Sequence, residues 1–134
     1  MGMKFTMTRG IARDLLAQAG KAVDEEVCGL LLGDTAGHID TILPAANVHP
    51  DPRRFFEIDP AVLIAATRAA RGGGMQIIGC YHSHPSGVAA PSATDAAMAA
   101  RDGKLWAIVA DGAIGWWRDG PDGFEALPSP AQRG

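Results

Sequence analysis

Apolar residues recur along this chain with two periods, near 3.6 and 2 residues, which are typical of helices and strands. Residues 9–20 have apolar side chains at helical spacing and end at a glycine, which predicts a first helix. Residues 60–70 predict a second helix, because Pro60 suits the first helical position and Asp59 can cap the helix start.

The other apolar runs are short and lie between turn-forming residues, as strands do. The expected strands are residues 27–32, 38–43, 55–58, 75–84, 105–110, 113–118 and 124–127. This order of elements predicts an α/β fold with a curved sheet, mixed or mostly antiparallel, flanked by helices. We expect a single domain over residues 1–128 and a flexible C-terminal tail over residues 129–134.

Candidate metal ligands stand where one of these strands ends. His82 and His84 are two residues apart, so a strand places both imidazoles on one face. Pro85 cannot donate to a strand ladder and closes the strand. A loop of small residues then leads to Ser92 and Asp95. Two imidazoles and a carboxylate are donors that zinc takes, and three protein ligands leave one position for water.

The same residues have a plainer interpretation. Ser92 and Asp95 also fit a helix capping box, and the alanine-rich segment after them, through Arg101, is strongly helix-forming. Two histidines in one strand can also be unrelated to metal. The combination of a strand ending in paired imidazoles and a helix starting with an acid favours a metal site over a purely structural role. Capping and ligation by this segment do not exclude each other.

These residues resemble the signature of the JAB1/MPN/Mov34 metalloproteases, also called the JAMM family. That signature is His-x-His-Pro, six residues, Ser, two residues and Asp, and the chain matches it from His82 to Asp95 without a gap. The family also carries a glutamate two residues before a Cys-Gly or similar pair, and Glu26 stands at that spacing here. Strand alternation turns the adjacent Glu25 the opposite way. The resemblance covers nearly the whole chain.

The resemblance implies the MPN fold, which is cytidine-deaminase-like, and one Zn²⁺ per chain bound by His82, His84 and Asp95. Glu26 would act as general base and acid. Ser92 would donate a hydrogen bond to the developing oxyanion or position the attacking water. The implied reaction is zinc-dependent amide hydrolysis without a covalent intermediate.

Enzymes of this family cleave amide or isopeptide bonds at the C-terminus of ubiquitin or ubiquitin-like proteins. Small stand-alone members of bacterial type act on sulfur-carrier proteins with a Gly-Gly tail, for example by releasing cysteine, and the short chain favours this substrate. One alternative is a metallopeptidase for cell-wall or phage-tail peptides. Another is a non-catalytic MPN scaffold, which the intact set of predicted ligands disfavours. A nucleobase deaminase is disfavoured because its His-x-Glu and Pro-Cys-x-x-Cys elements are absent.

Composition and charge restrict the class of protein further. The 134 residues are 47% hydrophobic and 20% charged, as in ordinary globular proteins, and the net charge of −3 disfavours nucleic-acid binding. No apolar run approaches the ~20 residues of a membrane span, and no signal peptide is evident, so we expect a cytoplasmic protein. Cys28 and Cys80 should be reduced core residues near each other below the site.

Overall fold

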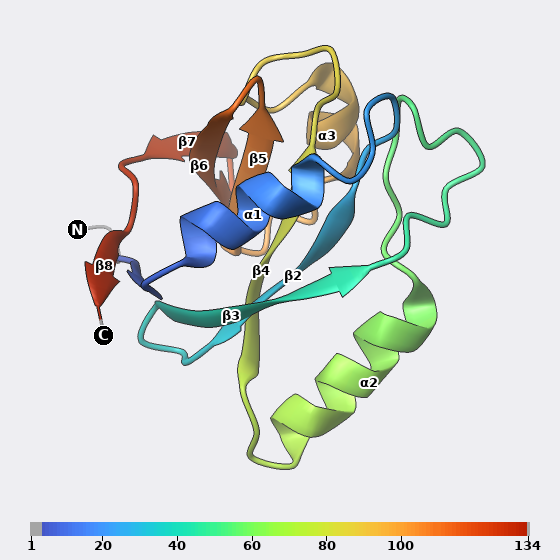
Figure 1. Cartoon of the computed structure of the whole chain (residues 1–134). Coiled ribbons are helices and arrows are strands. Elements are labelled where there is room, and N and C mark those ends of the chain that lie inside the picture. The colour runs from blue at the N-terminus through green and yellow to red at the C-terminus, as the bar shows by residue number, and fades with distance from the viewer. Residues whose placement is uncertain (1–3, 134) are drawn as a thin grey trace.

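The computed structural model describes residues 4–133, which fold into one curled sheet with helices on both faces (Figure 1). The strands are β1 (Thr6–Thr8), β2 (Cys28–Gly33), β3 (His38–Ala45), β4 (Gln76–Ser83), β5 (Leu105–Ala110), β6 (Ala113–Gly120), β7 (Gly123–Leu127) and β8 (Ala131–Arg133). The helices are α1 (Ile11–Ala19), α2 (Pro60–Arg71) and α3 (Ala93–Met98).

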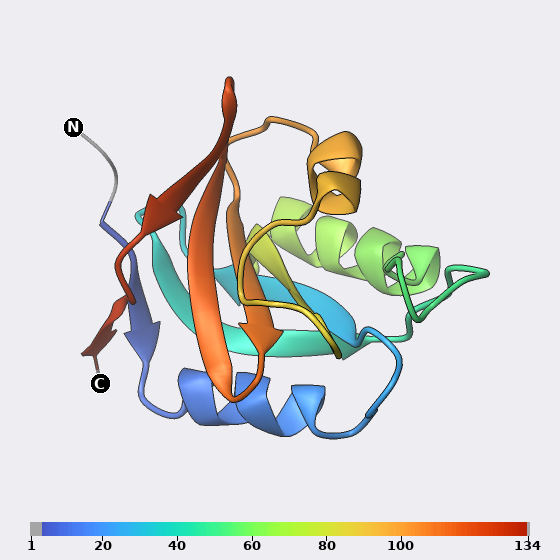
Figure 2. The ribbon, with the colours of Figure 1, turned by 90° about the horizontal axis from the view of Figure 1, so that it is seen from above.

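The strand order in the sheet is β7-β6-β5-β4-β2-β3-β1-β8. The pairs β4/β5, β1/β3 and β1/β8 are parallel and the other neighbours are antiparallel, so the predicted mixed sheet is confirmed. In Figure 2, α1 lies against one face of the sheet, and α2 and α3 lie on the other side. The sheet therefore separates two layers of helix.

Alternation along the central strand β4 assigns its side chains to two cores. Tyr81 faces the larger core under α1, where it packs with Leu15, Leu31 and other fully buried side chains. Cys80, one residue away, faces a smaller core that contains Phe56 and Trp106. The predicted metal ligands lie next to this second, smaller core.

The predicted helix start at Pro60 is confirmed, because the Asp59 carboxylate accepts a hydrogen bond from the Ala61 amide at 3.0 Å. The predicted strand over residues 55–58 is wrong. Only an isolated bridge between Asn47 and Ile58 forms there. The Asn47 side chain takes the place of a partner strand, because its Nδ2 donates to the Phe55 carbonyl and its Oδ1 accepts from the Glu57 amide. Phe56 and Ile58 of this segment pack in the smaller core.

Two further differences concern the ends of elements. The helix after Ser92 stops at Met98 rather than continuing through Arg101, because the Asp119 carboxylate accepts from the Arg101 amide at 2.9 Å and draws the chain away. Within the expected tail, Ala131–Arg133 forms β8 and pairs with β1. Regular structure therefore extends into the segment expected to be a flexible tail, and the flexibility itself stays a prediction.

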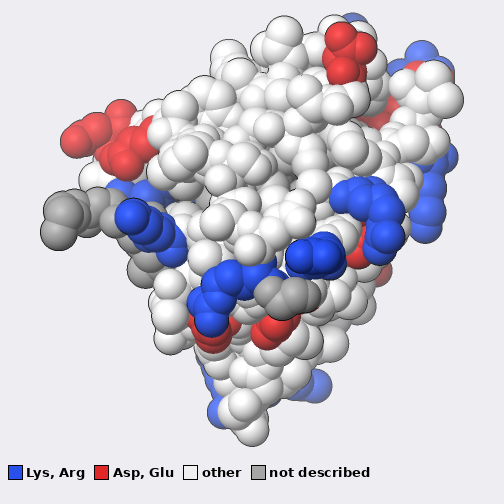
Figure 3. All heavy atoms as spheres, turned by 60° about the vertical axis from the view of Figure 1, so that its left-hand side comes forward, with Lys and Arg blue, Asp and Glu red and all other residues white. Residues whose placement is uncertain are grey.

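Figure 3 shows a face on which Lys and Arg side chains stand next to Asp and Glu side chains around a broad uncharged area. None of the helices in residues 4–133 is both long and apolar enough to cross a membrane. That the protein acts in the cytoplasm and binds no nucleic acid stays a prediction.

Candidate metal centre

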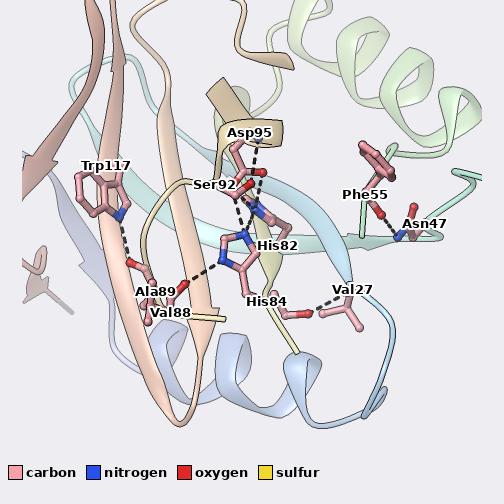
Figure 4. A network of polar contacts seen from close by, with 11 residues as sticks. Val27, Asn47, Phe55, His82, His84, Val88, Ala89, Ser92, Asp95 and Trp117 are labelled. Carbon is pink, nitrogen blue, oxygen red and sulfur yellow. Dashed lines mark hydrogen bonds and ion pairs between the residues drawn. The ribbon is translucent and has the colours of Figure 1, made fainter. Parts of the chain in front are cut away.

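The three predicted ligands converge on one point at the end of β4 (Figure 4). His82 lies on β4, His84 follows it directly, and Asp95 is the third residue of α3. The His82 and His84 Nε2 atoms are 3.0 Å apart. The Asp95 Oδ2 atom lies 3.2 Å from the first and 3.0 Å from the second. His82 and Asp95 are almost completely buried.

The spacing of these three atoms fits a tetrahedral ion. Ligands that sit ~2.0–2.1 Å from zinc at tetrahedral angles are about 3.3 Å apart, close to the 3.0–3.2 Å observed here. A carboxylate oxygen of Glu26 lies within 4.8 Å of ligand nitrogens of His82 and His84, beside the position of such an ion. The residues present can therefore hold a metal ion.

The two imidazoles are held in different ways. The His84 Nδ1 lies 2.8 Å from the Val88 carbonyl oxygen, so Nδ1–H donates to it and the Nε2 lone pair faces the centre. The His82 Nδ1 has no hydrogen-bond partner among the described residues. Its ring instead stacks on Phe56, with centroids 4.3 Å apart, and meets the Trp106 ring edge-on at 5.6 Å. Burial lowers the pKa of His82, which favours the neutral form that binds metals.

The carboxylate of Asp95 also belongs to a helix cap. The Asp95 amide donates to the Ser92 Oγ at 3.1 Å, and the Ser92 amide donates to the Asp95 Oδ2 at 2.9 Å. The capping box is confirmed, and it orients the carboxylate towards the histidines. Burial tends to raise the pKa of Asp95, but hydrogen bonds with His82 and His84 outweigh it and hold that pKa well below its usual range.

Glu26 lies just before β2 and has the properties of a proton carrier. Its side chain is 7% exposed, and its Oε1 atom has no partner among the described residues. Burial raises its pKa to about 7, against a smaller lowering by His84. A carboxyl group with a pKa near neutrality can both accept and return a proton. Glu25, by contrast, is exposed.

Backbone contacts fix the segment that carries Glu26. Its amide donates to the Pro52 carbonyl at 2.8 Å, and its carbonyl accepts from the Asn47 Nδ2 at 2.9 Å. The next residue, Val27, donates from its amide to the Ser83 Oγ at 2.9 Å. Ser83, which points away from the histidines, thus ties Glu26 to the strand that bears them.

Sequence reasoning had not assigned Asn47, Ser83 or Phe56 to the site. The only local signal for Ser83 was its position between two histidines, and Asn47 and Phe56 act through contacts that are distant in sequence. Phe56 and Trp106 also line a cavity of about 810 Å³ between α2 and the chain that follows α3. A ligand in this cavity would contact the two rings that support His82.

The two cysteines and Ser92 lie close to the centre but are not among its predicted metal ligands. Cys28 and Cys80 are free thiols in the smaller core, as expected, and burial raises the pKa of Cys28 to about 12. Ser92 is exposed at the centre's rim, and its own hydroxyl proton is free of the cap, in which the oxygen accepts.

Comparison with known proteins agrees with this geometry. Residues 8–119 match the family of prokaryotic homologues of the JAB domain. The chain is 38% identical over 103 residues to the desampylase of Haloferax volcanii, and the aligned region covers 72% of this chain and 74% of that protein. It is 32% identical over 94 residues to a probable TtuB-protein conjugate cleaving protease of Thermus thermophilus, covering 70% and 62% of the two chains.

The fold also matches a solved structure of the expected class. A JAB1/MPN domain protein from Archaeoglobus fulgidus superposes with a TM-score of 0.64 at 21% identity, over 98% of this chain and 100% of that one. The curled sheet and the family match define a JAMM-type hydrolase with the MPN fold. The chain belongs to the family of prokaryotic homologues of the JAB domain.

Proposed function

We propose that this protein is a zinc-dependent isopeptidase that cleaves the bond after the C-terminal Gly-Gly of a ubiquitin-like sulfur-carrier protein. The observation that carries the proposal is the convergence of His82, His84 and Asp95 at the spacing of a tetrahedral ion. The names of the two relatives, a desampylase and a TtuB-conjugate cleaving protease, support the substrate class.

In this proposal one zinc ion per chain is held by the two Nε2 atoms of His82 and His84 and by the Asp95 carboxylate. Zinc in such a site supplies Lewis acidity, which polarises a carbonyl group and makes water a better nucleophile at neutral pH. The His84–Val88 hydrogen bond and the Ser92 cap keep the donor atoms aimed at the ion.

Glu26 moves the proton. Its carboxylate accepts a proton as water attacks the scissile carbonyl carbon, and a C–O bond forms. It then delivers the proton to the leaving amine as the C–N bond breaks, so the products are a carboxylic acid and an amine, which ionise to carboxylate and ammonium at neutral pH. The Ser92 hydroxyl donates to the oxygen on which negative charge develops, a contact worth ~3 kcal/mol in known oxyanion holes.

The test uses the zinc-loaded protein and two substrates. One is a sulfur-carrier protein whose Gly-Gly tail is amide-linked to cysteine, and the other has its tail joined to a lysine of a second protein. We expect mass spectrometry to show a free Gly-Gly carboxylate with either leaving group. Cleavage should be absent when a chelator is added and in the variant Glu26→Gln. The variant Glu25→Gln, which alters the exposed neighbour, should cleave normally.

Two results would overturn the proposal. Intact substrates in the presence of a zinc-loaded protein would exclude carrier conjugates and turn attention to cell-wall or phage-tail peptides. Cleavage that persists after the zinc is removed would exclude the metal mechanism.

A further inference from the structure

The loop of residues 85–91 connects the histidines to the helix that bears Asp95, and it provides the acceptor for His84. The Val88 carbonyl oxygen lies 2.8 Å from the His84 Nδ1. The Val88 side chain is 71% exposed, and residues 85–87 are exposed as well. Packing of these side chains therefore does not hold the carbonyl in place.

Strand β6 holds this loop from the other side. The Trp117 Nε1–H donates to the Ala89 carbonyl oxygen at 3.1 Å, across 28 residues of sequence (Figure 4). Ala89 directly follows Val88, so the peptide group that joins them carries the acceptor for His84 at one end. The indole thus anchors the loop one residue away from the group that orients the imidazole.

Gly115, two residues before Trp117 on the same face of β6, allows the loop to come this close. A Cβ atom at Gly115 would lie 1.8 Å from the Ala89 oxygen, which is a backbone atom and cannot swing aside. The loop consequently rests on bare backbone at Gly115 and on an indole N–H at Trp117.

We propose that Gly115 and Trp117 are positioning residues, which seat the 85–91 loop so that the Val88 carbonyl accepts the His84 Nδ1–H and fixes the orientation of the ring. With Nδ1 bonded to the loop, Nε2 is the ring nitrogen that faces the centre, 3.0 Å from the Asp95 Oδ2. The orientation of the ring follows from the contacts of this chain alone, and its use for binding zinc rests on the proposed function.

A plain packing role for Trp117 makes a different prediction. Its ring also contacts the smaller core, so any replacement can lower stability. Packing alone would leave the hydrogen bond between His84 and the Val88 carbonyl unchanged in a variant that stays folded. The state of this hydrogen bond, rather than stability, therefore distinguishes the two roles.

Two variants perturb the contact between the loop and β6. Trp117→Phe removes the N–H donor while keeping an aromatic ring. Gly115→Ala places a Cβ atom 1.8 Å from the Ala89 carbonyl oxygen and 2.8 Å from the Trp117 Nε1, so it pushes the two bonded groups apart. The matched control is Trp116→Phe, because Trp116 is buried in the opposite core under α1.

The experiment is ¹H–¹⁵N NMR of the histidine rings in metal-free protein, which observes the His84 Nδ1–H and its exchange with solvent. We expect wild type and Trp116→Phe to show a His84 Nδ1–H that is protected from exchange by its hydrogen bond to the Val88 carbonyl, and the two loop variants to lose this protection. Zinc affinity, measured by competition with a chelator, should fall by about 10- to 100-fold in the loop variants.

Unchanged protection of the His84 Nδ1–H in folded Trp117→Phe and Gly115→Ala would overturn the inference. A loss of this protection in Trp116→Phe to the same extent would overturn it as well, since the effect would then be general. If wild type failed to bind zinc or to cleave carrier conjugates, the proposed function would fail, but the NMR result in metal-free protein would still decide the role of the loop.

Discussion

Asn47 makes every hydrogen bond that its side-chain amide can make with the backbone around it. Its Nδ2 group donates to the carbonyls of Glu26 and Phe55, both at 2.9 Å. Its Oδ1 atom accepts from the amides of His49 at 3.1 Å and Glu57 at 3.0 Å. One side chain thus ties the segment of the proposed base to the loop that carries the ring stacked on His82.

The variant Asn47→Asp tests this arrangement with almost no change in shape. Aspartate keeps the two accepting contacts but turns a carboxylate oxygen towards the carbonyls of Glu26 and Phe55. Two hydrogen bonds of ~1 kcal/mol each are lost, and the two facing acceptors add a cost of similar size, so the free energy of unfolding should fall by about 2–4 kcal/mol. Asn47→Ala, which loses all four bonds but lets water enter, should cost about as much.

Urea unfolding followed by tryptophan fluorescence measures the global change, and hydrogen exchange of the His49 and Glu57 amides measures the local one. The control is Thr67→Ala, which removes one exposed side-chain hydrogen bond on α2 and should change stability by less than about 0.5 kcal/mol. An Asn47→Asp protein as stable as wild type, with unchanged exchange at both amides, would refute the reasoning.

Three further predictions concern the packing around the centre. Gly79→Ala should strongly lower the thermal unfolding temperature, because its Cβ would lie 2.0 Å from a backbone oxygen of β5. The control is Gly72→Ala, which should be tolerated because the nearest atom lies 3.6 Å from a Cβ there. Phe56→Leu removes the ring stacked on His82 and should weaken zinc binding about tenfold in a chelator competition; unchanged affinity would contradict that role. Raising the pKa of Cys28 from 9.0 to about 12 makes its thiolate ~1000-fold scarcer at neutral pH, so native protein should resist a thiol reagent that labels unfolded protein quickly.

Local patterns were sufficient where one short segment determines the geometry. The two-residue period of a strand placed His82 and His84 on one face, and the spacing of Ser92 and Asp95 predicted the cap that the structure contains. Each of these features depends on backbone geometry over a few residues. The pairing of a proline with a preceding aspartate likewise located the start of α2.

Contacts between distant segments could not be predicted in this way. The strands β1 and β8 are only three residues long, and all side chains of β8 are exposed, so no apolar pattern marks them. The end of α3 depends on a hydrogen bond from Arg101 to Asp119, which overrides the helix propensity of the alanines. The contact between Trp117 and Ala89 joins residues 28 positions apart, and nothing near either residue indicates it.

Two carboxylates lie within reach of the paired imidazoles, and their roles separate the proposed mechanism from its alternatives. Asp95 has an oxygen 3.0–3.2 Å from both Nε2 atoms, whereas Glu26 belongs to a looser group that spans up to 4.8 Å. The proposed mechanism therefore takes Asp95 as the third ligand and Glu26 as the base.

The most direct test is the zinc dissociation constant of Glu26→Gln and of Asp95→Ala, each measured beside wild type by competition with a chelator. The assignment predicts that Glu26→Gln binds zinc within a few-fold of wild type, and that Asp95→Ala binds at least about 100-fold more weakly, since a first ligand should matter at least as much as an outer-shell partner. The reverse order, or equal losses in the two variants, would contradict it.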